Sequence, residues 1–279
     1  MPSPVALDAR SSRPQTVWEY RALIWNFTSR EMKARFKGTA IGWAWSFVGP
    51  LATILIYSLV FSVIIRIQPP PFGNGNPGNY AVWLICGLVT WNFISGTILQ
   101  GMPTLLSNGD LLRKVYFPSF VPVVSMTLAV GIQSLIELGV VMLILVAFLN
   151  VSWTWLLVPF WVACVVLFTV SVSYVLAVAN VRWRDLAQIM NVLVQIVFFL
   201  SPIIYPISLV PEYAGPIPVR LLVQLNPISH YIEVGRELLY ELVVPSPLEW
   251  GVLVLLSGLS ALLAAWVFRR WGQDVGEAL

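Results

Sequence analysis

Residues 119–149 read SFVPVVSMTLAVGIQSLIELGVVMLILVAFL, and this stretch decides the class of fold because Glu137 is its only charged side chain. A straight helix of this length would extend about 46 Å, whereas the hydrocarbon core of a bilayer is about 30 Å thick. We therefore expect a membrane-spanning helix that tilts, bends or starts in the interface. Pro118 and Pro122 favour a start in the interface.

The whole chain shares this apolar character. Of its 279 residues, 58% are hydrophobic, 13% are aromatic and only 10% are charged, whereas about 25% of the residues in a soluble domain are charged. So few charges cannot cover the surface of a water-soluble globule. The composition predicts an all-α integral membrane protein, and it excludes a disordered protein, a disulfide-rich secreted module and a nucleic-acid binder.

Uninterrupted apolar stretches predict six transmembrane helices, each long enough to cross a bilayer. They cover residues 41–65, 80–100, 119–149, 156–178, 188–206 and 249–268. We accordingly divide the chain into an N-terminal segment, 1–40, a transmembrane domain, 41–268, and a tail, 269–279. The N-terminus has no apolar core before residue 17, so we do not expect a secretory signal peptide.

The basic residues predict the orientation, because cytoplasmic loops carry an excess of lysine and arginine. With the N-terminus inside, 13 of the 16 basic residues are cytoplasmic, and the three outside are Arg66, Arg220 and Arg236. Both termini are therefore expected in the cytoplasm. The net charge of +3 then reflects mainly topology.

A surface helix is predicted before the first span, in residues 16–37. Its apolar side chains share one helical face, while most of its basic residues lie elsewhere. Such an amphipathic helix lies on the cytoplasmic membrane surface. It is either a simple anchor for the first span or an element that handles an anionic lipid.

A second non-spanning region, 207–248, is expected on the outer face between spans five and six. It contains two apolar pieces, 217–225 and 228–243, and each is shorter than a span. Asn226 followed by Pro227 is typical of a helix N-terminus. Short re-entrant or interfacial helices here would form a gate, or a simple lid on the bundle.

The sequence contains no motif for chemistry of its own. None of the three lysines lies in a GxxxxGK[ST] nucleotide-binding loop, so any ATP hydrolysis must come from another chain. The single histidine, His230, excludes a multi-histidine metal site. We therefore predict no catalytic, cofactor-binding or metal-binding residue. Glu137, with Gln133 one turn earlier, either lines a hydrated cavity or is protonated or hydrogen-bonded to a neighbouring helix.

Aromatic residues at span ends are explained by belts at the membrane interfaces. Trp91 and Phe93 in the middle of the second span, and Phe198 and Phe199 in the fifth, do not fit such a belt. Aromatic faces suit a conduit for sugar rings, whose C–H faces stack on them. Packing in the core or against lipid is the more common role of any one such residue.

Five motifs, in order along nearly the whole chain, resemble those of the permease subunits of ABC exporters for lipid-linked polysaccharides. REMKARFKGTAIGW at 30–43 is similar to the family pattern RDxKxRYKxTxLGxLW. Pro50 matches its membrane proline, and Glu31 replaces the usual Asp. The segment LRKVYFP, at 112–118, resembles the connection between helices two and three.

The remaining motifs lie in the second half of the chain. RDL at 184–186 resembles the short turn between helices four and five. SPIIYP at 201–206, and Asn226-Pro227 followed by Arg236, are similar to the extracellular end of the family. This family includes O-antigen, capsule, teichoic acid and galactan exporters.

The resemblance implies a homodimer of this chain that exports a polyprenyl-pyrophosphate-linked polysaccharide through a channel along the dimer axis, as in cell wall biogenesis. A separate cytoplasmic ATPase dimer would bind ATP and Mg²⁺ and contact residues 101–117. The implied ATPase-coupling residues are Asp110, Arg113 and Lys114. The lipid pyrophosphate would be handled by Arg30, Lys33, Arg35 and Lys37. The implied glycan conduit is Trp43, Tyr57, Trp91, Phe93, Phe198, Phe199 and Tyr205, and the outer gate is Tyr231, Glu233, Arg236 and Glu237.

The sequence says less about the cargo than about the transport function. Arginine outnumbers lysine 13 to 3, which suggests a GC-rich genome and favours an actinobacterial, for example mycobacterial, galactan exporter. Alternatives are an ABC exporter permease for drugs or small lipids, a membrane-embedded glycosyl or lipid transferase that uses Glu137, and a channel or secondary transporter. Secondary transporters commonly show internal repeats and more intramembrane charges, and neither is evident in this sequence.

Overall fold

The protein was analysed as a computed structural model that describes residues 18–36, 45–114, 117–213, 215–216, 218–272 and 275. No strand occurs in these residues, so the expected all-α class is confirmed. The helices are α1 (Arg21–Phe36), α2 (Trp45–Tyr57), α3 (Tyr80–Gly101), α4 (Thr104–Ser107), α5 (Gly109–Lys114), α6 (Phe120–Ala147), α7 (Val158–Arg182), α8 (Leu186–Leu200), α9 (Val219–Leu225), α10 (Pro227–Arg236) and α11 (Pro247–Trp271). Two π-helical segments, η2 (Ser58–Ile64) and η5 (Glu237–Glu241), continue α2 and α10, and two short 3-10 helices are η3 (Trp153–Leu157) and η4 (Ile207–Leu209).

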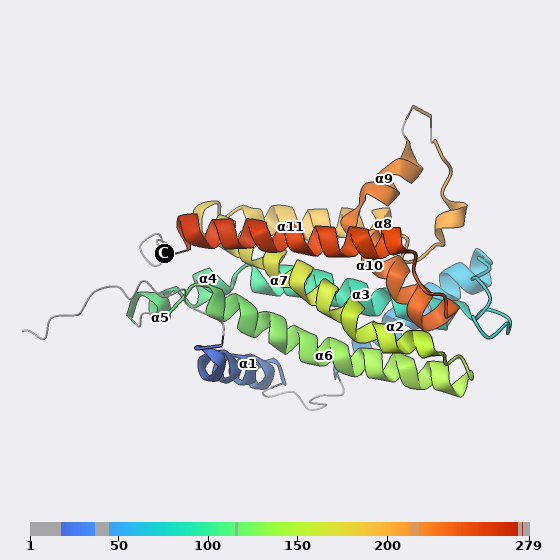
Figure 1. Cartoon of the computed structure of the whole chain (residues 1–279), viewed down its shortest axis with the longest axis horizontal. Helices are drawn as coiled ribbons and strands as arrows, with labels where there is room; N and C mark the ends of the chain where they lie inside the picture. The colour runs from blue at the N-terminus through green and yellow to red at the C-terminus, as the bar shows by residue number, and fades with distance from the viewer. Residues whose placement is uncertain are drawn as a thin grey trace, which may run out of the picture.

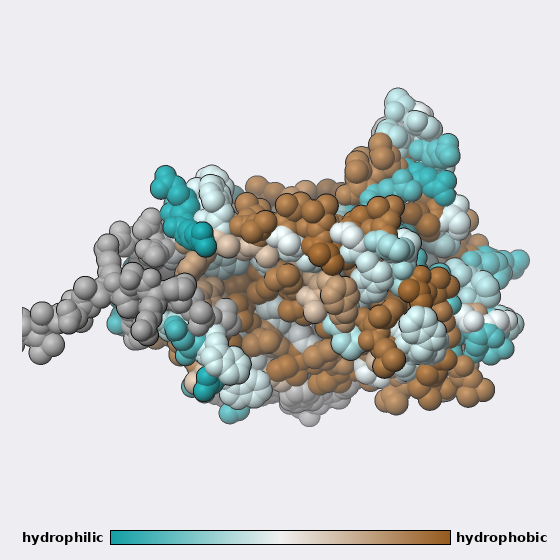
Figure 2. Space-filling view, viewed as in Figure 1, coloured by the Kyte–Doolittle hydropathy of each residue, from teal (hydrophilic) through white to brown (hydrophobic). Residues whose placement is uncertain are grey.

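Among the residues that the structure describes, four helical segments are long and apolar enough to cross a bilayer. They are Tyr80–Gly101, Phe120–Ala147, Trp153–Arg182 and Pro247–Trp271. Figure 1 shows them side by side along the long axis of the molecule. In Figure 2, apolar side chains cover much of the middle of the visible face, and polar side chains gather towards the ends. The chain is therefore a multi-pass membrane protein, as its composition predicts.

The first predicted span ends within one residue of the prediction, at Ile64, whereas the fifth is shorter in the structure. α2 passes into the π-helix η2, and the start of the first predicted span lies outside the described residues. α8 ends at Leu200 instead of residue 206, because Ser201 is extended and the residue before a proline disfavours the helical conformation. Its 15 residues extend about 22 Å, less than the hydrocarbon core. The total of six spans stays a prediction.

α3 is the central helix of the bundle. Within its apolar window 72% of the residues are buried, compared with 17% for α11, which therefore lies at the periphery. α3 packs against α6, α7 and α10, and α11 packs along α7. The core of the molecule thus surrounds the second of the predicted spans.

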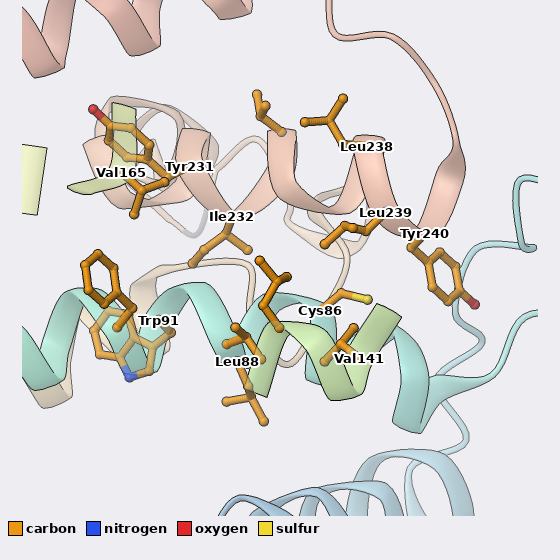
Figure 3. Packing of buried hydrophobic residues seen from close by; sticks show 14 of the residues in the cluster. Cys86, Leu88, Trp91, Val141, Val165, Tyr231, Ile232, Leu238, Leu239 and Tyr240 are labelled. Atoms are coloured by element: carbon orange, nitrogen blue, oxygen red, sulfur yellow. The ribbon is translucent and has the colours of Figure 1, made fainter. Parts of the chain in front are cut away.

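The non-spanning segment formed by α10 and η5 belongs to this core. Tyr231, Ile232, Leu238 and Leu239 are fully buried. In Figure 3 their helix lies against α3, and Ile232 points towards Leu88. The short helix α9 instead projects away from the bundle (Figure 1). The two apolar pieces of the external region therefore have different surroundings.

Helix α1, which precedes the first predicted span, packs against α6. Ile24 and Phe27 are buried in a cluster with Phe117 and Val121. Trp18 and Trp25 remain exposed, at 73% and 59%. Two residues of the predicted apolar face of α1, Ile24 and Phe27, thus contact protein, while Trp25 in α1 and Trp18 just before it are exposed at the surface.

Candidate functional site

Arg236, at the end of α10, is a buried cation that holds the backbone beyond α8. Its guanidinium donates hydrogen bonds to the carbonyl oxygens of Pro202 and Ile203, the latter at 2.5 Å. It also lies over the Trp83 ring, 3.6 Å from the centroid. Gly87 makes room for it, because a methyl group at this position would overlap the guanidinium. Arg236 itself is only 4% exposed.

Two more side chains hold the same stretch, Ser201–Ile204, which we name the α8 break. The amide nitrogen of Asn226 donates to the Ser201 hydroxyl at 2.7 Å. The Tyr80 hydroxyl donates to the carbonyl of Ile204, also at 2.7 Å. A helix end leaves carbonyl groups without intrahelical partners. Side chains of α3 and of the α9–α10 segment supply partners here, so they determine the position of the α8 break.

The segment η5 is held from the other side by the α6–α7 connection. The Thr154 hydroxyl donates to the carbonyl of Leu238 at 2.9 Å. The side-chain amide of Asn150 donates to the carbonyls of Leu239 and Tyr240, at 3.2 and 2.8 Å. α10 and η5 are therefore fixed to the bundle at both ends.

Carboxylates next to Arg236 have strongly altered acidity. Burial raises the pKa of Glu233 to about 7, although Arg236 opposes the rise. Burial and the nearby charges of Glu249, Glu241 and Glu233 raise the pKa of Glu237 to about 8. Burial lowers the pKa of Arg236 to about 10, and it stays charged at neutral pH. Tyr231, the fourth residue of the predicted gate, lies in the core, where its hydroxyl shares a 2.7 Å hydrogen bond with Ser257.

The structure brings together most of the predicted conduit residues. Tyr57 of α2 stacks on Phe198 of α8, with ring centroids 6.0 Å apart. Trp91 of α3 contacts the same Phe198 ring at 5.4 Å, and Phe199 contacts it at 5.2 Å. The Tyr205 hydroxyl donates to the Phe199 carbonyl at 2.7 Å. We call Tyr57, Trp91, Phe198 and Phe199 the aromatic cluster.

The aromatic cluster continues outwards through residues that sequence reasoning missed. Phe61 contacts Tyr57 at 6.1 Å and stacks on Tyr80 at 6.3 Å, and Tyr80 contacts Trp83 at 5.9 Å. The spacing of residues 57 and 61 by one helical turn was the only sequence signal for this extension. Of the remaining predicted conduit residues, Phe93 borders Gly131 of α6 instead, and Trp43 lies outside the described residues.

Arg35, a predicted pyrophosphate ligand, is bonded to the membrane helices. Its guanidinium donates to the side-chain oxygen of Gln133 at 2.6 Å and to that of Gln100. Gln133 in turn donates to a carboxylate oxygen of Glu137 at 3.2 Å, and Glu137 is 8% exposed. Burial lowers the pKa of Arg35, whereas Glu31 and Glu137 raise it. Arg35 and the pair Gln133 and Glu137, to which the sequence patterns assign separate roles, thus form one polar network.

The other predicted pyrophosphate ligands lie apart from this network. Arg30 donates to Glu31 at 2.9 Å and to the side-chain oxygen of Asn108 at 2.8 Å. Lys33 is exposed. Lys37 lies outside the described residues. Two cations of α1, Arg30 and Lys33, therefore remain accessible to a ligand.

Two of the three predicted ATPase-coupling residues line a polar hollow at the end of the bundle. Asp110 and Arg113 of α5 line it with Ser107 and Arg184, and its volume is about 350 Å³. Lys114 is exposed outside this lining. In Figure 1 this end of the molecule also carries the C-terminal end of α11. Arg184 was missed as a coupling residue, although it belongs to the RDL motif.

The chain matches the family described as ABC-2 type transporter over residues 22–240. This match covers α1 and the α10–η5 segment except for one terminal residue of each, and all elements of the aromatic cluster. The chain belongs to the ABC-2 type transporter family. This assignment confirms the expected transport subunit, as opposed to an enzyme, and membrane proteins of this family work with a cytoplasmic ATPase.

Curated proteins similar to this ABC-2 chain include named export permeases. An O-antigen export system permease protein, RfbA, of Myxococcus xanthus is 27% identical over 264 residues, 94% of this chain and 97% of that protein. An RfbA of Klebsiella pneumoniae is 27% identical over 214 residues, 76% of this chain and 77% of that protein. The polysialic acid transport protein KpsM of Escherichia coli is 21% identical over 235 residues, covering 80% and 81%.

Proposed function

We propose that this ABC-2 chain is the permease of an exporter that moves a polyprenyl-pyrophosphate-linked polysaccharide across the bacterial cytoplasmic membrane. ATP hydrolysis on a separate ATPase subunit drives the movement. The aromatic cluster carries the proposal, because rings from α2, α3 and α8 contact one another and its exposed member, Phe199 at 56%, offers a ring on which a sugar could stack. The names of the O-antigen and polysialic acid relatives favour a polymer over a drug. We keep galactan, suggested by composition alone, as the proposed glycan.

The permease acts as a homodimer with six spans per chain and both termini in the cytoplasm. α8 has no buried residue, and its apolar side chains Ile189, Val192 and Ile196 are each more than 50% exposed. Contact with a second copy of the chain would cover this exposed face and stabilise a helix that is too short to span the bilayer alone. α2 and α8 both carry the aromatic cluster, so a dimer axis beside them would place two clusters around one channel.

The lipid pyrophosphate binds beside α1. Arg30 and Lys33 provide accessible cations, and a guanidinium suits the fixed geometry of phosphate oxygens. Arg35 connects this surface to Gln133 and Glu137 in the bundle. Binding of the headgroup at α1 would thus act on α6 through the hydrogen bond between Arg35 and Gln133.

The outer gate consists of a fixed part and a moving part. α10 and η5 form the fixed part, because Arg236, Asn150 and Thr154 bond them to their neighbours. α9 forms the moving part. α9 projects from the bundle, and Leu221 and Leu225 on it are 50% and 68% exposed.

The test is export in cells that express the permease with its ATPase and a radiolabelled glycan. Phe198→Leu shortens the aromatic surface and should slow the appearance of polymer outside the cell. Phe168→Leu is the matched control, since it removes a buried ring that contacts Tyr231 at 4.9 Å away from the aromatic cluster. Equal export by the two variants at equal thermal stability would contradict the proposal.

The same system separates the proposal from a membrane-embedded transferase. The exporter requires an intact ATPase, whereas a transferase that uses Glu137 would extend the glycan without it. Export that persists with an inactive ATPase, together with loss of glycan synthesis in Glu137→Gln, would favour the transferase.

A further inference from the structure

A hollow on the opposite face of α3 from the aromatic cluster is not used by the proposed transport path. It lies between α3, α6 and α7 and has a volume of about 150 Å³. Its walls are almost entirely apolar, and they include Val89, Phe93, Leu138, Val162 and Val165. α6 and α7 run beside each other in Figure 1, so the hollow is a gap between two spanning helices.

The small residue Gly131 gives the hollow its depth. A Cβ atom at Gly131 would meet only Phe93, at an ordinary contact distance of 3.5 Å. A longer side chain would therefore extend into the hollow. On the opposite wall, Thr90 and Phe93 of α3 are 2% and 6% exposed, so a molecule reaches them only from within the hollow.

The position in the bundle limits what the hollow can bind. Thr90 lies in the middle of α3 and Gly131 near the middle of α6, which places the hollow near the centre of the bilayer. Its rim includes Leu128 and Leu135, which are 41% and 56% exposed to the surroundings. At this depth the surroundings are hydrocarbon chains. No charged residue lines the hollow, so the ligand has no charged group there.

We propose that this hollow binds one hydrocarbon chain of a bilayer phospholipid. An apolar cavity of about 150 Å³ accommodates a ligand of the size of benzene, and a few consecutive methylene groups fill a comparable space. The occupant is a bilayer lipid and not the tail of the cargo, because the hollow and the aromatic cluster lie on opposite faces of α3.

The bound chain supports the fixed part of the gate through Trp161. This side chain lines the hollow, and its indole nitrogen donates to the Tyr231 carbonyl of α10 at 2.9 Å. Its ring also lies against Gly235, where a Cβ would be 2.6 Å from it. A chain in the hollow therefore packs against the residue that positions α10, and occupancy stabilises the α10–η5 segment.

Photolabelling in vesicles tests the site with the full-length protein. The vesicles contain phosphatidylethanolamine and phosphatidylglycerol, with a small fraction of phosphatidylglycerol that carries a diazirine near the terminal methyl group of one acyl chain, the part that reaches the centre of the bilayer. We expect adducts on Thr90 and Phe93 by mass spectrometry. Leu253 and Ser257 of α11, which are 0% and 2% exposed, should remain unlabelled. Labelling confined to exposed residues such as Leu262 would overturn the proposal.

Matched variants at one position sharpen this test. Gly131→Leu fills the hollow and should abolish the adducts on Thr90 and Phe93, while Leu262, at 69% exposure, stays labelled. Gly131→Ala leaves the hollow open and should keep them. Val162→Trp fills it from α7 if Gly131→Leu fails to fold. Adducts that persist in both filled variants would contradict the assignment.

A second probe identifies the source of the chain. A diazirine-bearing polyprenyl phosphate at the same concentration should label Thr90 and Phe93 less than the phospholipid does. Stronger labelling by the isoprenoid would overturn the assignment to bilayer phospholipid. Protection of both residues by a neighbouring protein copy, detected as a crosslink through Leu128 or Leu135, would also overturn it.

Discussion

Arg236 illustrates how one residue can determine a local arrangement. A buried guanidinium is costly unless its donors are paired, and here two backbone carbonyls and the Trp83 ring surround it. Lysine has neither the planar fork nor the stacking surface of arginine. The sequence placed Arg236 at the outer gate, but burial and the carbonyl partners follow only from the fold.

Arg236→Lys should destabilise the protein by about 2 kcal/mol, because bonds from a charged donor to buried carbonyls are lost. Thermal unfolding of the purified protein in detergent measures the change. Arg220→Lys is the control, since the Arg220 side chain is 40% exposed and pairs with Glu212 only at 4.0 Å. Equal unfolding temperatures for the two variants would show that Arg236 does not hold the α8 break.

Gly87→Ala should also destabilise the protein. Replacing a helical glycine with alanine normally stabilises by roughly 1 kcal/mol, but a Cβ at this position overlaps the Arg236 guanidinium. Gly139→Ala on α6 is the matched change, because nothing lies within 4 Å of its Cβ. Unfolding temperatures should move in opposite directions, and a rise in both would contradict the tight contact at Gly87.

The α10–η5 segment is the element in which buried acids accumulate. Glu233, Glu237 and Glu241 lie on one short helical segment, and Glu249 and Arg236 face them. The folded protein holds protons on Glu233 and Glu237 near neutral pH, whereas an unfolded glutamate has a pKa of about 4.3. The folded state therefore binds more protons than the unfolded state between these values.

The free energy of unfolding should accordingly fall as pH rises from about 5 to about 8. In this range Glu233 and Glu237 lose protons that they bind more tightly in the folded state than in the unfolded state. The unfolding temperature measured between pH 5.5 and 8.5 checks the sign. Glu237→Gln should flatten the decline, and Glu212→Gln, at a side chain that is 75% exposed, should leave it unchanged. A rise in stability with pH would disprove this account of the segment.

At the scale of the whole molecule, the polar hollow between α5 and Arg184 joins two parts of the chain that are far apart in sequence. Both belong to predicted cytoplasmic connections, and both face the same end of the bundle. This arrangement offers one surface to the ATPase instead of two independent loops.

Arg113→Glu combined with Arg184→Glu should therefore reduce copurification of the ATPase and lower its permease-dependent activity. Inverting two charges repels acidic partners that the arginines attract. Arg269→Glu combined with Arg270→Glu, on the last turn of α11, is the charge-matched control. A similar loss in both pairs would indicate a general charge effect and not docking at the hollow.

Much of the fold could be predicted from local patterns. α3 and α11 begin and end within about three residues of the predicted spans, because long apolar runs bounded by capping residues and proline leave one conformation. Asn226 caps α10 through the amide of Ile228 at 3.1 Å, as its sequence position indicates. α8 is shorter than predicted, because an apolar run does not reveal that Ser201 leaves the helix before Pro202.

The sequence by itself determined the all-α membrane fold, the transporter family and the aromatic residues available to a conduit. Those properties depend on the amino-acid composition, on the length and spacing of the apolar stretches and on short sequence motifs. Only the tertiary structure decided that Arg35 reaches Gln133, that Arg236 holds the α8 break and that an apolar hollow lies behind α3. Each of these joins residues from different helices, and their contacts depend on how the helices pack against one another, which no local pattern encodes.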